Sequence, residues 1–158
     1  MYFKMTTGWE DGIADLTERL IKALSDDKSV LWLLSGGSNI TASVQIIDSI
    51  SMDLRTNLSV MLADERYGYV GHADSNWEQL LNAGFSTDNV RILPVLEKGL
   101  SLEDTIQKYD EMAKIELSNN DLIIAQLGIG SDGHIAGILP SSPAVSNKYY
   151  VAGYEAQD

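Results

Sequence analysis

Two side chains that could transfer a proton, Asp132 and His134, stand two residues apart in the segment Gln126 to Pro140. Histidine is the side chain whose unperturbed pKa, about 6.5, allows it to accept and to return a proton near neutral pH. Three glycines accompany the pair: Gly128, Gly130 and Gly133. Glycines allow positive φ and let a ligand approach the backbone closely. A lone histidine in such a turn more often caps a helix or fills a gap, but the nearby aspartate favours a general-base site.

Two further polar clusters follow apolar runs. Residues 35–38 read Ser-Gly-Gly-Ser after the run 29–34, and a helix is predicted to begin at about Asn39. A glycine turn between a strand and a helix directs free N–H groups and the positive helix end at an anion. Asp64, Glu65 and Arg66 follow a second apolar run, 57–63, and alone they would suggest only a charged, solvated strand end. Because the carboxyl ends of parallel strands lie at one edge of a sheet, we expect all three clusters to meet there.

The elements that must position these clusters alternate between strands and helices, which is typical of an α/β protein with a parallel sheet. Residues 121–127 predict a fully buried strand in the middle of the sheet. A glycine-containing loop at 67–72 could cover the site, and we expect His72 to have a supporting role at most. The other predicted strands are 29–34, 57–63, 90–95 and 149–154, and the predicted helices are 9–26, 39–50, 74–81 and 102–117.

Composition limits the classes of function. The chain of 158 residues is long enough for one domain, 1–158, and its net charge of −12 argues against a nucleic-acid partner. It has no cysteine, so neither disulfides nor thiolate metal sites are expected, and no His/Asp/Glu cluster has the spacing of a metal site. Residues 1–5 lack the features of a signal peptide, and no apolar run approaches the length of a membrane span. We therefore expect a soluble, cytoplasmic protein without a membrane partner.

The motifs together resemble those of the 6-phosphogluconolactonase branch of the sugar-phosphate isomerase/deaminase superfamily. The matching stretches are Gly-Ile-Gly-Ser-Asp-Gly-His-Ile-Ala-Gly-Ile-Leu-Pro at 128–140, Ser-Gly-Gly-Ser at 35–38, Asp-Glu-Arg at 64–66 and Asp-Ser-Asn at 74–76. The resemblance implies a Rossmann-like open parallel sheet flanked by helices in three layers. It also implies hydrolysis of 6-phosphogluconolactone to 6-phosphogluconate, a reaction of carbohydrate metabolism in the pentose phosphate pathway.

The resemblance also suggests roles for individual residues. The substrate phosphate would bind to Ser35, Gly36, Gly37 and Ser38, with Asp64 at the sugar ring and Arg66 nearby. His134 would act as general base on a water that attacks the lactone carbonyl, supported by Asp132. Backbone groups of the loop with Gly128 and Gly130, or the Arg66 side chain, could stabilise the oxyanion, and the sequence does not choose between them. Neither a metal nor a cofactor is required.

Two alternatives stay open. Amino-sugar-phosphate isomerase/deaminases share the Asp-Gly-His stretch, but they place a glutamate directly before the proline, where this chain has Leu139, and a tyrosine where it has Arg66. The second alternative is a sugar-phosphate sensor or a non-catalytic binding remnant. Regulators with this fold carry a helix-turn-helix ahead of the domain, and only about eight residues precede the first predicted helix here.

The chain departs from the family pattern in two places. The family continues the phosphate loop as Ser-Thr-Pro, whereas this chain has Ser38-Asn39-Ile40, so we expect Asn39 or Thr41 to cap the helix instead. Family members also continue for several tens of residues beyond the strand predicted at 149–154, with an arginine and a lysine that help to hold the phosphate. We therefore expect a C-terminally truncated lactonase-like domain with one open flank of the sheet and weaker phosphate binding.

Overall fold

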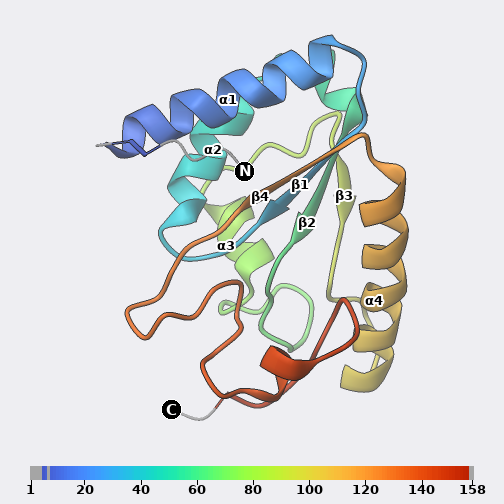
Figure 1. The fold of residues 1–158 in the computed structure, drawn as a ribbon. Helices are drawn as coiled ribbons and strands as arrows, with labels where there is room; N and C mark the ends of the chain where they lie inside the picture. The colour runs from blue at the N-terminus through green and yellow to red at the C-terminus, as the bar shows by residue number, and fades with distance from the viewer. Residues whose placement is uncertain (1–4, 7, 157–158) are drawn as a thin grey trace.

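The computed structural model describes residues 5–6 and 8–156, so most of the stretch 1–5, read above for a signal peptide, lies outside the described residues. Its centre is a sheet of four parallel strands in the order β3-β2-β1-β4 (Figure 1). The strands are β1 (Val30–Leu34), β2 (Leu58–Leu62), β3 (Arg91–Leu93) and β4 (Leu122–Gln126). The predicted parallel α/β sheet is confirmed, and all four strands end at the same edge.

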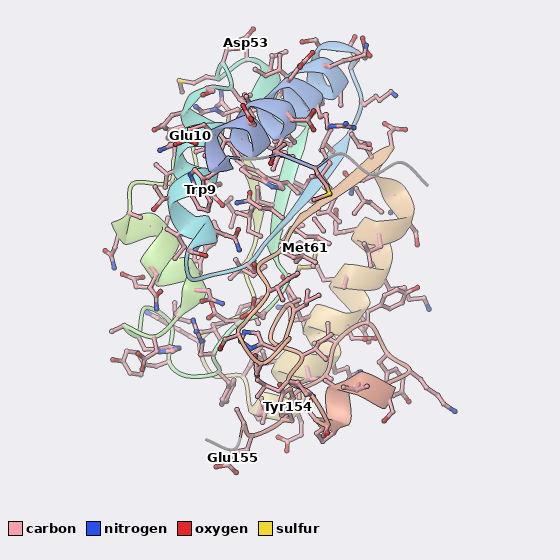
Figure 2. All side chains as sticks on the ribbon, turned by 60° about the vertical axis from the view of Figure 1, so that its left-hand side comes forward. Trp9, Glu10, Asp53, Met61, Tyr154 and Glu155 are labelled. Carbon is pink, nitrogen blue, oxygen red and sulfur yellow. The ribbon has the colours of Figure 1, made fainter. Side chains whose placement is uncertain are left out.

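Helices cover both faces of the sheet and complete three layers. Buried side chains of α1 (Trp9–Ser25), α2 (Asn39–Asp48) and α3 (Asn76–Asn82) share one core cluster with β1 and β2. On the other face, α4 (Leu102–Asn119) packs through Tyr109 and Ala113 against Leu31, Met61 and Leu93. Figure 2 shows Met61 in the middle of the molecule, among the side chains that fill the space around the sheet. Two short 3₁₀ helices, η1 (Leu54–Asn57) and η2 (Pro143–Ser146), complete the described elements.

The helices form where the apolar spacing predicts them. In α1, Leu20 and Leu24 are almost fully buried, and Ile13, Leu16 and Ile21 pack against the same cluster, as expected of an amphipathic helix. The helix α4 begins at a cap, since the Ser101 hydroxyl accepts a hydrogen bond from the Asp104 N–H at 3.1 Å. No helix among residues 5–6 and 8–156 is long and apolar enough to cross a membrane.

The prediction of a fully buried central strand at 121–127 is wrong. β4 lies at the edge of the sheet and pairs only with β1, and its side chains alternate between half-buried and exposed, with Ile123 41% exposed. The fully buried strand is β2. Because α4 packs on β1, β2 and β3, the side chain of Ile123 stays exposed to solvent. The open flank expected for the sheet is present along β4.

The strand predicted at 149–154 is also absent. This segment runs in irregular conformation beside α4, where the Val151 N–H donates to Asp110 Oδ1 at 2.8 Å and Gly153 lies against Ile106. Its apolar and aromatic composition favours a strand, but a strand needs the edge of a neighbouring strand to pair with. Here the neighbour of residues 149–154 is the helix α4 and not a strand. The backbone N–H of Val151 therefore bonds to a side chain of that helix.

The end of β2 is held in place by a tyrosine of α4. The Tyr109 hydroxyl donates to Leu62 O at 2.8 Å and accepts from Leu62 N–H at 3.0 Å, and burial raises the pKa of this phenol. Leu62 is the last residue of β2, two positions before Asp64. The hydroxyl therefore satisfies both backbone polar groups of Leu62, a buried residue, where the chain leaves the sheet.

We expect Tyr109→Phe to lower the free energy of unfolding by about 1–3 kcal/mol, because both backbone groups of Leu62 lose their buried partner. Urea denaturation at neutral pH measures the change. Tyr150→Phe is the matched control, since that ring is 60% exposed and should change stability by less than about 0.5 kcal/mol. Equal stabilities of the two variants would contradict a bridging role for Tyr109.

Candidate active site

From β1 the chain adds β2 and then β3 on one side, and it later adds β4 on the other side of β1. The strand order therefore changes direction between β1 and β4. In open α/β sheets, ligands bind at such a switch point, beyond the carboxyl ends of the strands. Ser35, directly after β1, joins the two loops there: its hydroxyl donates to Gln126 O at 3.3 Å and accepts from the Gly128 N–H at 3.3 Å. The loops that follow β1 and β4 are therefore fixed together at the predicted site.

The loop 35–38 presents unused backbone donors. Gly37 has φ +66°, and the backbone N–H groups of Gly36, Gly37 and Ser38 have no hydrogen-bond partner within the described part of the chain. Residue Ser38 is the N-cap of α2 and makes no side-chain cap. These N–H groups lie at the positive end of α2, an arrangement that suits an anion.

The capping role expected of Asn39 or Thr41 is wrong. The Asn39 amide instead donates to Ser35 Oγ at 3.2 Å, and the Thr41 side chain makes no hydrogen bond within residues 5–6 and 8–156. A β-carbon on Gly128 would lie 2.8 Å from Asn39 Nδ2, so the two loops pack closely at this point. Asn39 therefore connects the loops and leaves the helix N–H groups uncapped.

The three side chains of the segment 64–66 have different surroundings. Glu65 lies at the N-terminus of α3, where its carboxylate accepts from Asn76 N–H at 2.7 Å, Trp77 N–H at 3.2 Å and the Ser75 hydroxyl at 2.9 Å. It caps that helix. Asp64 is half-buried and Arg66 is exposed, and both face the amide of Asn76.

Asp64 is a carboxyl group in a partly desolvated position. Burial raises its pKa above the ordinary value, and the hydrogen bond from Asn76 Nδ2 at 2.9 Å and the charge of Arg66 oppose that rise. A protonated His134 ring would also lower the pKa of Asp64, so the histidine loop lies within electrostatic reach of this carboxyl. Gly137 lies closer still, because a β-carbon there would be 2.8 Å from Asp64 Cβ.

His134 and Asp132 form a hydrogen-bonded pair at the end of the β4 loop. The distance from Nδ1 to Asp132 Oδ1 is 2.6 Å, and the His134 backbone N–H donates to the same oxygen at 3.2 Å. This backbone hydrogen bond lowers the pKa of Asp132, so the aspartate is a carboxylate at neutral pH and can only accept. Nδ1 must therefore carry the proton, which leaves Nε2 of the neutral ring as a base.

Gly130 is required for that pair. A β-carbon there would lie 2.3 Å from two atoms of the His134 ring and 2.7 Å from Asp132 Oδ1. The Gly130 N–H donates to His134 O at 2.9 Å, and Gly133 N–H donates to Gly130 O at 2.9 Å. The turn thus folds the imidazole directly over a residue without a side chain.

Two residues of the site were not predicted to belong to it. Asn76 is completely buried and bonds to Asp64, Glu65 and Arg66, and its place in the Asp-Ser-Asn motif was the available signal. The Tyr154 hydroxyl donates to Gly137 O and accepts from Leu139 N–H at 3.1 Å, so it clamps the histidine loop. Figure 2 places Tyr154 at the opposite end of the molecule from Asp53. No local pattern around Tyr154 indicated this contact.

His72 lies outside this group, as expected. It is buried, with its Nε2 hydrogen-bonded to Arg66 O at 2.9 Å, and Gly68 packs against its ring. The contact supports the backbone of Arg66. Among residues 5–6 and 8–156, no group of three or more His, Cys, Asp or Glu residues could hold a metal ion.

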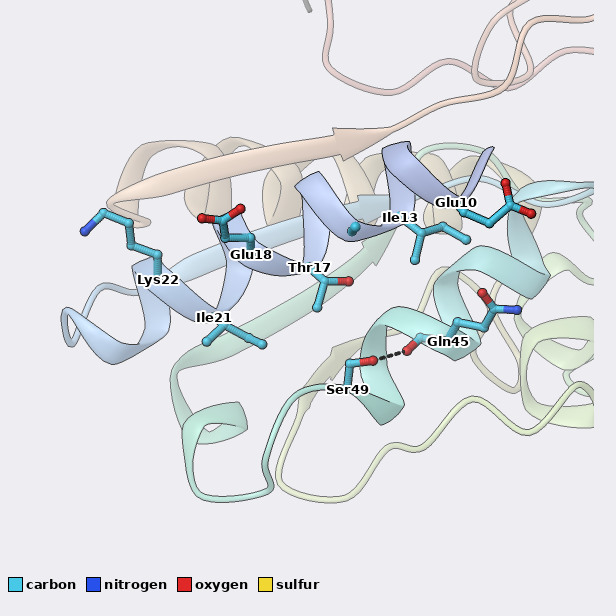
Figure 3. Close-up of a pocket in the computed structure, with 9 residues that line it drawn as sticks. Glu10, Ile13, Thr17, Glu18, Ile21, Lys22, Gln45 and Ser49 are labelled. Carbon is cyan, nitrogen blue, oxygen red and sulfur yellow. Dashed lines mark hydrogen bonds between the residues drawn. The ribbon is translucent and has the colours of Figure 1, made fainter. Parts of the chain in front are cut away.

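A groove lies elsewhere, between α1 and α2 (Figure 3). Ile13, Thr17 and Ile21 of α1 line it on one side, and Gln45 and Ser49 line it on the other. None of the predicted site residues lies there.

Comparisons of the sequence and of the fold with known proteins point to the same family. The family profile for glucosamine-6-phosphate isomerases/6-phosphogluconolactonase matches residues 9–157. The 6-phosphogluconolactonase of Pseudomonas aeruginosa is 30% identical over 137 residues, covering 84% of this chain and 55% of the relative, and that of Pseudomonas putida is 33% identical over 132 residues, covering 82% and 52%. The chain thus spans about half the length of these curated relatives. The crystal structure of 6-phosphogluconolactonase from Thermotoga maritima shares the fold, with a TM-score of 0.65, 20% identity, and coverage of 86% of this chain and 62% of that one.

The pKa is raised for Asp64 and lowered for Asp132, so replacing each aspartate by asparagine should change stability in opposite directions. A raised folded pKa means that the Asp64 carboxylate costs stability at pH values above that pKa, and the cost disappears as the pH falls below the unfolded value. Asp64→Asn should therefore raise the free energy of unfolding at pH 7, with a gain that shrinks toward acid pH. Urea denaturation between about pH 3 and pH 7 measures it, because that range includes the unfolded pKa of aspartate, about 3.9.

Asp132→Asn is the control, and it should change the free energy of unfolding in the opposite direction. A lowered folded pKa means that the Asp132 carboxylate contributes stability above the unfolded value, and this is lost only as the pH falls through the folded pKa. Asp132→Asn should lower stability at pH 7. Destabilisation by Asp64→Asn at pH 7 would contradict the desolvation of Asp64.

Proposed function

The chain belongs to the family of glucosamine-6-phosphate isomerases and 6-phosphogluconolactonases, and we propose that it hydrolyses 6-phosphogluconolactone to 6-phosphogluconate. The observation that carries this proposal is the His134–Asp132 pair, which leaves Nε2 free as a base in the loop that packs on Asp64. The names of the curated relatives support the same reaction. Leu139, at the position where the deaminases have glutamate, favours lactone hydrolysis over deamination.

In the proposed reaction, His134 Nε2 takes a proton from a water molecule while the water oxygen bonds to the lactone carbonyl carbon. The tetrahedral intermediate then collapses, the bond from carbon to ring oxygen breaks, and the imidazolium returns its proton to that oxygen. Asp132 holds the ring in the required tautomer and stabilises the imidazolium. Proton transfer of this kind accelerates a reaction about 10²- to 10⁴-fold.

Substrate binding would use the other two loops. The N–H groups of Gly36, Gly37 and Ser38 would hold the phosphate at the start of α2, and Asp64 would contact the sugar. The Gly130 N–H already donates to His134 O, which favours the exposed Arg66 guanidinium as the donor to the oxyanion. Gly128 and Gly130 would allow the sugar to approach the backbone.

These residues would perform the reaction without a metal or a cofactor. The substrate is a small soluble sugar phosphate, and the proposal includes a cytoplasmic location and no nucleic-acid partner. The net charge of −12 would slow the encounter with an anion, while the local donors would still bind it.

His134→Ala should lower kcat at least 100-fold and leave the affinity for 6-phosphogluconate nearly unchanged, because the base acts in the transition state. Asp132→Asn should give a smaller loss of the same kind. Lactone hydrolysis and calorimetric binding measure the two effects. If His134→Ala lost turnover, binding and folding to the same extent, the histidine would be structural.

Two assays separate this proposal from its rivals. Release of ammonia from glucosamine 6-phosphate would support a deaminase and overturn the proposal. Tight binding of 6-phosphogluconate without lactone turnover would support a sensor or a binding remnant.

Gly37→Val should weaken the binding of 6-phosphogluconate at least tenfold, because a β-branched residue cannot keep φ at +66° without strain and would turn the N–H groups away. Gly84→Val is the matched control: its φ is +96°, it also has open space around it, and it lies at the far end of α3. Both variants should lose stability, but only the first should lose affinity in calorimetric titration. Undiminished affinity of Gly37→Val would place the phosphate elsewhere.

A further inference from the structure

Asn76 occupies the centre of the site and uses every polar group of its side chain. The residue is 0% exposed. Its Nδ2 donates to Asp64 O and to Asp64 Oδ2, both at 2.9 Å, and its Oδ1 accepts from Arg66 Nη1. One neutral amide thus stands between a carboxylate and a guanidinium.

The backbone of Asn76 is as firmly held as its side chain. It is the first residue of α3, and its N–H donates to Glu65 Oε1 at 2.7 Å. The preceding residue, Ser75, caps the helix by accepting from the Glu78 N–H at 3.2 Å. The backbone of Asn76 is therefore held in place, and its amide can orient the side chains of Asp64 and Arg66.

Asn76 also sets the distance to the phosphate loop. A β-carbon on Gly36 would lie 2.0 Å from Asn76 Oδ1 and 2.5 Å from its Cγ. The amide therefore packs directly against the backbone of the loop whose N–H groups are unpartnered. The position of Asp64 and Arg66 relative to that loop is fixed through this contact.

The amide keeps the two charged groups from neutralising each other. Arginine and aspartate side by side commonly form a bidentate ion pair that uses two N–H groups and both carboxylate oxygens. Within the described part of the chain, no ion pair joins Asp64 to Arg66, and Asp64 Oδ1 and the Arg66 Nε and Nη2 groups have no hydrogen-bond partner. These are the groups that a polar substrate could contact.

We infer that Asn76 is a positioning residue: its amide acts as a neutral spacer that holds Asp64 and Arg66 apart, beside the phosphate loop, with one side of each free for the sugar phosphate. The inference rests on the proposed function for the identity of the ligand. It assigns a role to a residue that touches the two charged groups and not the reacting atoms.

The test replaces the spacer by a charged isostere. In Asn76→Asp, the new carboxylate pairs with Arg66 and repels Asp64, so kcat/KM for the lactone and the affinity for 6-phosphogluconate should each fall at least tenfold. The pKa of the Asp64 carboxyl, followed by carbon NMR, should rise further. Asn82→Asp is the matched control, because Asn82 lies on the same helix, is exposed, and bonds only to Glu78. It should leave kcat/KM and the affinity for 6-phosphogluconate within about twofold and should not shift the pKa of Asp64.

The exchange variant Asp64→Asn with Asn76→Asp distinguishes positioning from simple packing. It reverses the polarity of the hydrogen bonds, since the new amide at 64 and Arg66 can both donate to the new carboxylate at 76. Stability should recover relative to Asn76→Asp, while kcat/KM and affinity stay low. Recovery of activity together with stability would overturn the spacer role.

The two proposals fail in different ways. Absence of lactone turnover in the unmodified chain would overturn the proposed function alone. In that case the spacer role would still be tested by the Asp64 pKa and by 6-phosphogluconate binding, and it would be overturned if Asn76→Asp changed neither.

Discussion

The site depends on the parallel pairing of β1 with β2 on one side and with β4 on the other. In this register, Leu34 lies opposite Leu62 and Gln126, so three loops leave the sheet at the same level. The Ser35 hydroxyl and the Tyr109 hydroxyl then fix the ends of those strands. The rigid sheet thus determines where the loop 35–38, a pair of charged side chains and a histidine can meet.

Glycines complete the site by leaving space for particular side chains. Gly36 gives its space to the Asn76 amide, Gly130 to the His134 ring, and Gly137 to Asp64. In each case a methyl group would overlap a side chain that the proposed chemistry needs. Gly36 and Gly130 of the motifs therefore act through close packing within the protein, whereas Gly37, Gly133 and Gly137 also adopt positive φ.

The chain is strongly acidic, and the three carboxylates near the candidate site have different local partners. The Glu65 carboxylate accepts hydrogen bonds from the N-terminus of α3, and the Asp132 carboxylate accepts them from the backbone and ring of His134. Asp64 is partly desolvated. Of these three carboxylates, Asp64 thus lies in the candidate site at an energetic cost. That cost is the kind of local compromise between stability and function that active sites show.

The sequence by itself determined the fold class and the order of the elements from α1 to β4, and it indicated which three motifs meet at one edge of the sheet. Apolar periodicity and glycine positions are local signals, and they correctly predicted α1, β1, α2, β2, α3, β3 and α4. They could not show that β4 is an edge strand or that residues 149–154 pack on α4, because strand pairing depends on which neighbour is present in space. Nor could they predict that Asn39 would bond to Ser35 instead of capping α2. The contacts of Asn76 and Tyr154 were decided only by the tertiary structure, since their partners are residues that other segments of the chain bring to them.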